Sequence, residues 1–192
     1  MAESDQLENL RIACLTCTRC GLRQGCKNVV FGVGPVPADV LFIGEGPGEQ
    51  EDLSGEPFVG PAGRLLNDYL CAVGIERESV YIANIVKCRP PRNRDPLPEE
   101  QEACIPWLRA QTKLLHPKII VCLGRIAAMR IIKPDFRITC EHGQWFEKGA
   151  FAMTATFHPS ALLRDPRNRS AAYEDFIAIA ERRAALYGRQ RD

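Results

Sequence analysis

Cysteines are the residues of this 192-residue sequence with the clearest potential for chemistry, because the chain contains nine of them. Cys17 and Cys20 form a C-x2-C pair, and Cys88 and Cys104 follow at wider spacing. A high, odd cysteine count in a sequence whose first residues do not resemble a secretion signal favours metal or cluster ligation over disulfides. Four thiolates can hold a tetrahedral zinc ion or an iron–sulfur cluster. The residues alone leave zinc and iron open.

The remaining five cysteines have two interpretations. Cys14 and Cys26 lie close enough in sequence to the C-x2-C pair to serve as substitute ligands. We expect the other three, Cys71, Cys122 and Cys140, to be core thiols on the apolar faces of their elements.

A glycine-rich segment with four acids, GEGPGEQED (44–52), follows the apolar run VLFIG (40–44). Closely spaced glycines allow a backbone to approach a ligand. The segment does not match G-x-G-x-x-G, and its acids would repel phosphates, so dinucleotide binding is disfavoured. The pattern instead favours a carboxylate, such as Glu45, that acts on a neutral or cationic centre.

Two ring-bearing residues and one short apolar pair are further candidates. Phe58, among glycines and prolines, suits either a pocket wall or a buried packing role. His158 directly follows an apolar run, and a histidine at a strand end is well placed for a ligand site of an α/β sheet. Leu162 and Leu163 stand beside Arg164 in a segment expected to be exposed, and such a group is typical of wedges that enter a duplex.

Charge is balanced overall, with 25 Lys and Arg against 24 Asp and Glu, but it is unevenly distributed. The segment KCRPPRNR (87–94) contains no acid, and arginines recur from Arg164 onward. These stretches are candidate phosphate-facing surfaces, or simply solvated faces.

The elements that must position these residues alternate in type. Apolar runs predict strands at 40–44, 81–86, 118–124 and 150–157, and periodicity predicts helices at 4–13, 63–73, 99–115, 125–132 and 170–187. This alternation predicts one α/β domain over residues 1–192, a three-layer α/β/α sandwich with a mostly parallel central sheet of about four strands. Ligands of such sheets bind at the carboxyl ends of the strands, where the three motif loops begin. No apolar run is long enough to cross a bilayer, so we expect a cytoplasmic protein with no membrane partner.

Four segments, in order, resemble the family-four uracil-DNA glycosylases, the iron–sulfur branch of that superfamily. They are GEGPGEQED, GEPFVGPAGRLL, YIANIVKCRPPRNRDPLP and FHPSALLR, and the similarity extends from about Cys17 to Arg164. The resemblance implies an α/β/α fold and hydrolysis of the N-glycosidic bond of deoxyuridine in DNA, which releases uracil and leaves an abasic site. It also implies a [4Fe-4S] cluster on four ligands: Cys17, Cys20, Cys88 and Cys104.

The resemblance also implies roles for the residues that would bind uracil. Phe58 would stack on the flipped base, and the amide of Asn84 would bond to uracil O4 and N3–H but reject cytosine. Glu51 is the candidate that blocks the 5-position and so excludes thymine. Gly46 stands where the family-one enzymes have a catalytic aspartate.

Catalysis would then depend on three residues. His158 would donate a hydrogen bond to uracil O2 as negative charge develops there. Glu45 would orient water and stabilise the cationic sugar, with help from Asn93. We expect DNA contacts from the segment after the histidine: Ser160, Leu162, Leu163 and Arg164.

The loop KCRPPRNRDP lacks the inserted histidine with which one related branch traps its product, so we expect turnover and no covalent adduct. We expect a monomer, the simplest state for an enzyme that holds one flipped nucleotide. We expect a structural role for the cluster, because it is remote from the chemistry. Two other functions remain open from the residues. The chain could be a non-catalytic nucleic-acid-binding module stabilised by a cluster or zinc, in which Glu45 and His158 are structural. It could also be a nucleotide-binding α/β enzyme that uses the glycine-rich segment.

Overall fold

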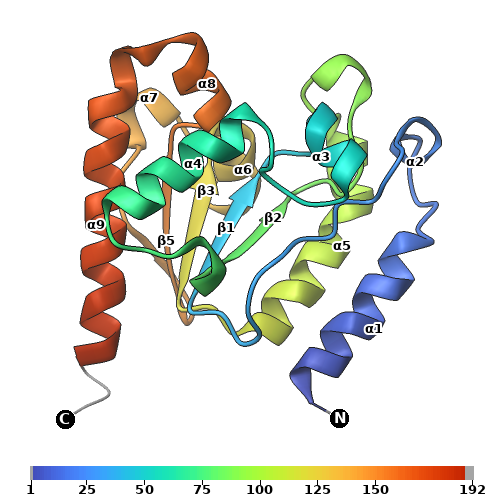
Figure 1. Cartoon of the computed structure of the whole chain (residues 1–192), viewed down its shortest axis with the longest axis horizontal. Coiled ribbons are helices and arrows are strands. Elements are labelled where there is room, and N and C mark those ends of the chain that lie inside the picture. The colour runs from blue at the N-terminus through green and yellow to red at the C-terminus, as the bar shows by residue number, and fades with distance from the viewer. Residues whose placement is uncertain (1, 189–192) are drawn as a thin grey trace.

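A five-stranded sheet with helices on both faces forms the centre of the computed structural model, which describes residues 2–188 (Figure 1). The strand order is β2-β1-β3-β5-β4, and β4 alone runs antiparallel to its neighbour, β5. The strands are β1 Val40–Gly44, β2 Tyr81–Asn84, β3 Ile119–Leu123, β4 Phe146–Lys148 and β5 Phe151–Thr156. The predicted three-layer α/β fold is confirmed. β4 is a fifth strand beyond the four apolar runs, and it lies within the stretch 138–149, whose sequence carries only a weaker β signal.

In the described part of the chain, the helices confirm the five predicted segments and add four shorter ones. Their bounds are α1 Glu3–Leu15, α2 Leu22–Gly25, α3 Glu49–Ser54, α4 Pro61–Ala72, α5 Pro98–Leu115, α6 Arg125–Ile131, α7 Ile138–Glu141, α8 Pro159–Arg164 and α9 Arg169–Gly188. Short 3-10 turns occur at Arg77–Ser79, Pro91–Asn93 and Pro166–Asn168. Among the described residues, no helix has the length and apolar character needed to cross a bilayer.

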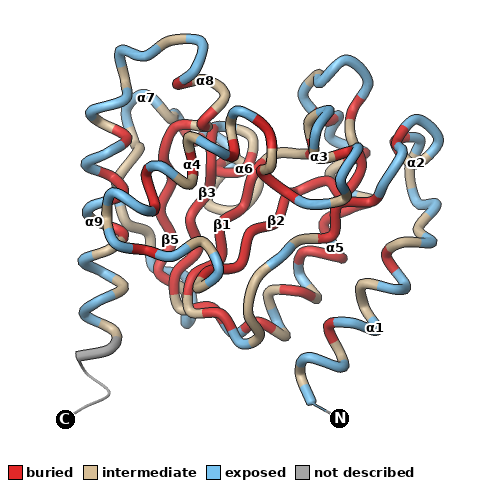
Figure 2. Tube along the Cα trace, viewed as in Figure 1, coloured by how far each residue is buried: buried red, intermediate tan, exposed pale blue. Residues whose placement is uncertain are grey.

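The two faces of the sheet bury separate apolar clusters because side chains alternate along each strand. Leu41 and Ile43 pack on the face covered by α1, α5 and α6. Val40 and Phe42 pack on the opposite face, which α4 and α9 cover. All of β1 is buried, and Figure 2 shows the central strands as a continuous buried region. Because these strands are buried on both faces, their sequences are unbroken runs of apolar residues.

The parallel strands bring their carboxyl ends to one edge of the sheet, at the top in Figure 1. The segments that leave these ends are the glycine-rich segment after β1, the basic loop after β2, α6 after β3 and the His158 segment after β5. Residues far apart in sequence therefore meet at this edge, as the topology predicts.

Candidate active site

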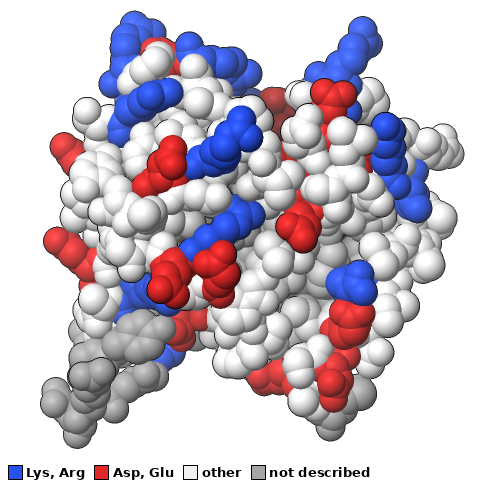
Figure 3. Space-filling model, viewed as in Figure 1, with Lys and Arg blue, Asp and Glu red and all other residues white. Residues whose placement is uncertain are grey.

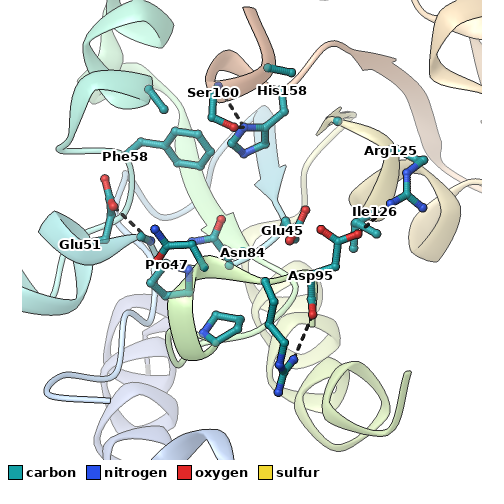
Figure 4. A pocket seen from close by; sticks show the side chains of 18 of the residues that line it. Glu45, Pro47, Glu51, Phe58, Asn84, Asp95, Arg125, Ile126, His158 and Ser160 are labelled. Atoms are coloured by element: carbon teal, nitrogen blue, oxygen red, sulfur yellow. Dashed lines mark hydrogen bonds and ion pairs between the residues drawn. The ribbon is translucent and has the colours of Figure 1, made fainter. Parts of the chain in front are cut away.

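A pocket of about 370 Å³ lies at the carboxyl ends of the strands (Figure 4). Its size is within the usual range for small-molecule sites. The sequence-predicted residues that line it are Glu45, Gly46, Glu51, Phe58, Asn84, Asn93, His158, Ser160 and Arg164. The structure thus brings together side chains from four separate segments of the chain.

His158 stands at the end of β5 and caps α8. Its Nδ1 atom accepts a hydrogen bond from the backbone N–H of Ser160 at 3.2 Å and lies 2.8 Å from the Ser160 hydroxyl. Because a backbone N–H can only donate, Nδ1 carries no proton, and the neutral ring carries its proton on Nε2. Burial, followed by the positive charge of Arg164, lowers the pKa of His158 to about 4. The ring is therefore a neutral Nε2–H donor at physiological pH, and it faces the pocket beside Phe58 in Figure 4.

Phe58 is buried and has a left-handed backbone conformation, with φ of 54°. Its ring centroid lies 5.7 Å from that of His158. Two glycines make this placement possible. A Cβ atom at Gly63 would lie 1.8 Å from the Phe58 carbonyl oxygen, and one at Gly44 would lie 2.7 Å from Cζ of the ring. The glycines of this region therefore serve close packing around the aromatic ring.

Glu51 fixes the loop that carries Phe58. Its Oε1 atom accepts hydrogen bonds from the backbone N–H groups of Val59 and Gly60 at 2.9 and 2.8 Å. Its Oε2 atom accepts from the N–H of Gly48 at 3.1 Å, which also caps α3. One carboxylate thus joins the glycine-rich segment to the Phe58 loop at the pocket wall.

Asn84 is the last residue of β2 and is 2% exposed. Its side-chain Oδ1 atom is buried and has no hydrogen-bond partner among the described residues. Leaving such an acceptor unpaired costs about 1–3 kcal/mol, so its presence in a pocket points to a ligand that donates to it. A Cβ atom at Gly44 would lie 2.3 Å from this oxygen, so the glycine leaves the amide open to the pocket.

Glu45 follows β1 and is half-buried. Burial, followed by the nearby negative charge of Asp95, raises the pKa of Glu45 to about 7, while Arg125 and Arg164 act in the opposite direction. Asn93 lies across the pocket in the loop after β2, and its Oδ1 accepts a hydrogen bond from Arg89 Nε at 2.7 Å. The carboxyl group is therefore poised to exchange a proton near neutral pH.

A second cavity is lined by the four predicted cluster ligands, together with Cys14. The indole N–H of Trp107 donates to Cys17 Sγ at 3.3 Å, and the backbone N–H of Lys87 donates to Cys104 Sγ at the same distance. Hydrogen bonds of this kind stabilise thiolate ligands. Within residues 2–188, no three His, Cys, Asp or Glu side chains are arranged to hold a single metal ion. The thiols instead share the lining of one cavity.

Comparisons with known proteins agree with this geometry. The model of the uracil DNA glycosylase superfamily matches residues 31–180. The type-4 uracil-DNA glycosylase of Archaeoglobus fulgidus is 42% identical over 92% of this chain and 93% of its own length. That of Thermotoga maritima is 47% identical over 79% and 80%, and that of Sulfurisphaera tokodaii is 41% identical over 92% and 84%. The chain belongs to the type-4 uracil-DNA glycosylase family.

One predicted contact of this type-4 glycosylase is wrong. Leu162 is 1% exposed and packs in the apolar cluster beneath α8, so it is not available as a wedge. The predicted exposed loop is a helix that begins with Pro159 and turns Leu162 inward. Leu163, the next residue, is 40% exposed.

Sequence reasoning also missed a charged pair. Arg125 and Asp95 line the pocket and form an ion pair at 2.7 Å, and both influence Glu45. Arg125 directly follows Gly124 at the end of β3, so the rule that sites form at strand ends could have identified it.

Among the predicted core thiols, Cys122 is buried as expected, but Cys71 and Cys140 are exposed.

Proposed function

We propose that this type-4 glycosylase flips uracil out of DNA into the Asn84 pocket and hydrolyses its N-glycosidic bond. The reaction releases free uracil and leaves an abasic site, as expected of a DNA repair enzyme. The observation that carries the proposal is one pocket with a buried, unpaired Asn84 oxygen and a neutral Nε2–H donor on His158. Uracil offers an N3–H donor and an O2 acceptor to these two groups.

Recognition of uracil would depend on Asn84 and Phe58. The Asn84 oxygen would accept from uracil N3–H, and its NH2 group would donate to O4. Cytosine has an acceptor at N3 and a donor at C4, so it would leave two buried polar groups unpaired. Stacking on the Phe58 ring would offset part of the free energy needed to unstack the base.

Exclusion of thymine is assigned to Glu51. Its carboxylate is held by three backbone N–H groups, and a Cβ atom at Gly48 would lie 2.7 Å from its Oε2. A side chain held in this way cannot swing aside at low cost. The 5-methyl group of thymine would therefore meet a rigid wall.

Departure of the base would be assisted by His158. As the C1′–N1 bond breaks, its electron pair moves to the uracil ring, and negative charge accumulates on O2. A preorganised N–H donor at that oxygen is worth roughly 3 kcal/mol of barrier. The pKa of about 4 means that the ring donates a hydrogen bond as neutral imidazole and does not transfer a proton as a strong acid.

Addition of water would complete the hydrolysis. The Glu45 carboxylate would orient a water molecule toward C1′, stabilise the positive charge on the sugar and accept the proton that the water loses. Asn93 would help to hold the water. Since Gly46 offers no carboxylate, Glu45 is the acid of the glycine-rich segment assigned to this step.

DNA would lie over the rim of the pocket. Arg92, Arg164, Arg167 and Arg169 are exposed, and Figure 3 shows basic side chains along the upper edge, above the α8–α9 connection and the loop after β2. We assign phosphate or groove contacts to Ser160, Leu163 and Arg164, without Leu162. We also propose that the protein acts as a monomer in the cytoplasm, because the proposed chemistry needs no residue beyond those of a single copy of the chain.

The thiols of Cys17, Cys20, Cys88 and Cys104 would hold a [4Fe-4S] cluster. They line one cavity, and two of them accept N–H hydrogen bonds, which fits a thiolate donor set. When bound, such a group would link α5 to the segments that precede β1 and follow β2, and so order the basic loop without taking part in the hydrolysis.

A cleavage assay on labelled DNA with a single uracil, thymine or cytosine tests this function. We expect cleavage of the N-glycosidic bond at uracil only. The rate of this cleavage should fall by about 10²–10³-fold in His158→Ala and by about 10²–10⁴-fold in Glu45→Gln. Lys148→Gln, an exposed change outside the pocket, is the matched control. Salt-dependent DNA binding without base release by folded protein with its cluster would instead favour the non-catalytic binding module.

A further inference from the structure

Lys87 is a buried lysine that the proposed hydrolysis does not use. It is 1% exposed and lies between Asn84, which would read the base, and Cys88, a predicted cluster ligand. It also lines the cysteine cavity. A buried ammonium is strongly disfavoured unless partners compensate it, so its contacts indicate what it does.

The first contact of the Lys87 amine is with the backbone of β2, on the side of that strand where no further strand pairs with Asn84. β2 is at the edge of the sheet, and Ile82 exchanges backbone hydrogen bonds of 2.8 and 3.0 Å with Val33 on its outer side. Backbone groups two residues apart in a strand point the same way, so the Asn84 carbonyl faces the same side, beyond this bridge. Lys87 Nζ donates to that carbonyl at 3.1 Å. The amine therefore satisfies the Asn84 carbonyl, which no neighbouring strand reaches on this side.

The second contact connects the amine to α5. Lys87 Nζ donates to Gln111 Oε1 at 2.6 Å, and Gln111 Nε2 donates to the Phe31 carbonyl at 2.9 Å and to the Tyr81 hydroxyl at 3.2 Å. α5 also carries Cys104, whose sulfur accepts from the backbone N–H of Lys87. Lys87 is thus hydrogen-bonded both to α5, the helix that carries the predicted cluster ligand Cys104, and to Asn84, the residue that would recognise uracil.

The charge of the amine is placed to act on the thiols. Lys87 lines the same cavity as Cys104 and Cys14, and its backbone nitrogen lies 3.3 Å from Cys104 Sγ. The cysteine cavity also contains Arg19 and Arg23 in its lining, and no described Asp or Glu lines it. Thiolates that held a metal group in this cavity would therefore face three cationic side chains, of which Lys87 is the buried one.

We propose that Lys87 is a positioning residue that couples the cysteine cavity to uracil recognition. It fixes the Asn84 backbone from the outer edge of β2, and its charge stabilises the thiolate-bound group. The part of this inference that concerns uracil rests on the proposed function. The part that concerns the cavity does not.

The test compares Lys87→Met, which keeps the length of the side chain but removes its charge and donors, with Tyr81→Phe. The control alters the same buried network without a contact to Asn84. We expect Lys87→Met to weaken inhibition by free uracil and to raise KM by about 10–100-fold, as partners of binding groups do. Its cluster should also have a more negative reduction potential, because a nearby positive charge favours uptake of an electron. Tyr81→Phe should leave uracil inhibition within about twofold of the wild type and should not shift the reduction potential.

Unchanged uracil inhibition and an unchanged potential in Lys87→Met, with only a lower melting temperature, would overturn the proposal. If Lys87→Met does not fold, Gln111→Leu removes the second partner of the amine and should weaken uracil inhibition more than Tyr81→Phe does. Equal effects of these two variants would also overturn it. If the wild type releases no uracil, the proposed function fails, while the potential still reports on Lys87.

Discussion

At the scale of single residues, burial and a few fixed contacts set the chemistry of the pocket. The sequence predicted His158, Asn84 and Glu45 as functional because of their motifs and strand-end positions. It could not predict that Ser160 fixes the histidine tautomer or that Asn84 has an unpaired oxygen, since both depend on packing. Burial, followed by the negative charge of Asp95, raises the pKa of Glu45, while Arg125 opposes the rise. The order of the sequence does not place Asp95 or Arg125 beside Glu45.

The raised pKa of Glu45 predicts the pH dependence of catalysis. Because the carboxylate form must orient water, kcat/KM should rise with pH and level off above a midpoint of about 7. Stopped-time cleavage assays between about pH 5 and 9 measure this profile. Glu45→Gln should be slow and lack the rise, because its amide does not titrate. A wild-type profile that falls through neutral pH would contradict the assigned role.

At the scale of elements, the strands were predictable and the short helices between them were not. β1 and β3 are buried on both faces, so their apolar runs identify them unambiguously. α8 was predicted as a loop because it has six residues, too few for periodicity to show that Leu162 points inward. The Phe58 loop has no regular structure, and its conformation depends on Gly63 and on the carboxylate of Glu51.

Gly63→Ala should disrupt the Phe58 loop. The new methyl group would meet the Phe58 carbonyl at 1.8 Å, and relief of such a clash costs about 1–3 kcal/mol or more. We expect a lower melting temperature and a higher KM for uracil-containing DNA. Gly25→Ala is the matched control, since nothing lies within 4 Å of its Cβ position. Equal melting temperatures and KM values for the two variants would refute the packing argument.

Glu51→Ala should affect both the loop and the selectivity. It leaves three backbone N–H groups without their carboxylate partner, which costs about 1–3 kcal/mol for each group that stays buried and unpaired. Urea denaturation measures the resulting loss of stability. If the carboxylate is also the wall against thymine, thymine excision should become detectable relative to the wild type. Lower stability of Glu51→Ala without any thymine excision would support the role of Glu51 in fixing the loop and contradict its role in excluding thymine.

At the scale of the whole molecule, the alternation of strands and helices specified the layers, while β4 added a fifth strand at one edge. Its three residues and mostly exposed side chains give no apolar run, so the sequence signal was weak. The cysteines show the same limit. Spacing and family resemblance identified four of the five thiols that line one cavity. The exposure of Cys71 and Cys140, in contrast, follows from which side of a helix faces solvent.

Loss of one cavity thiol should destabilise the region between α1, α5 and the basic loop. Cys104→Ser should lose the visible absorbance of an iron–sulfur cluster and unfold at a lower temperature, because a structural metal group contributes directly to folding. Cys71→Ser, at an exposed thiol outside the cavity, should retain both. Purified Cys104→Ser with full absorbance and wild-type melting would contradict the assigned ligand set.

Mass spectrometry of a single-uracil oligonucleotide incubated with the protein tests the central claim most directly. We predict that a hydroxyl group replaces the uracil-1-yl group of the DNA, with both the hydroxyl and the N1 hydrogen of free uracil supplied by one water molecule. Free uracil should appear in equal amount, and the mass of the protein should not change. The same oligonucleotide with thymine should keep its mass. An unchanged uracil oligonucleotide, or a covalent protein–DNA adduct in place of free product, would contradict the account of this pocket as a hydrolytic, turning-over site.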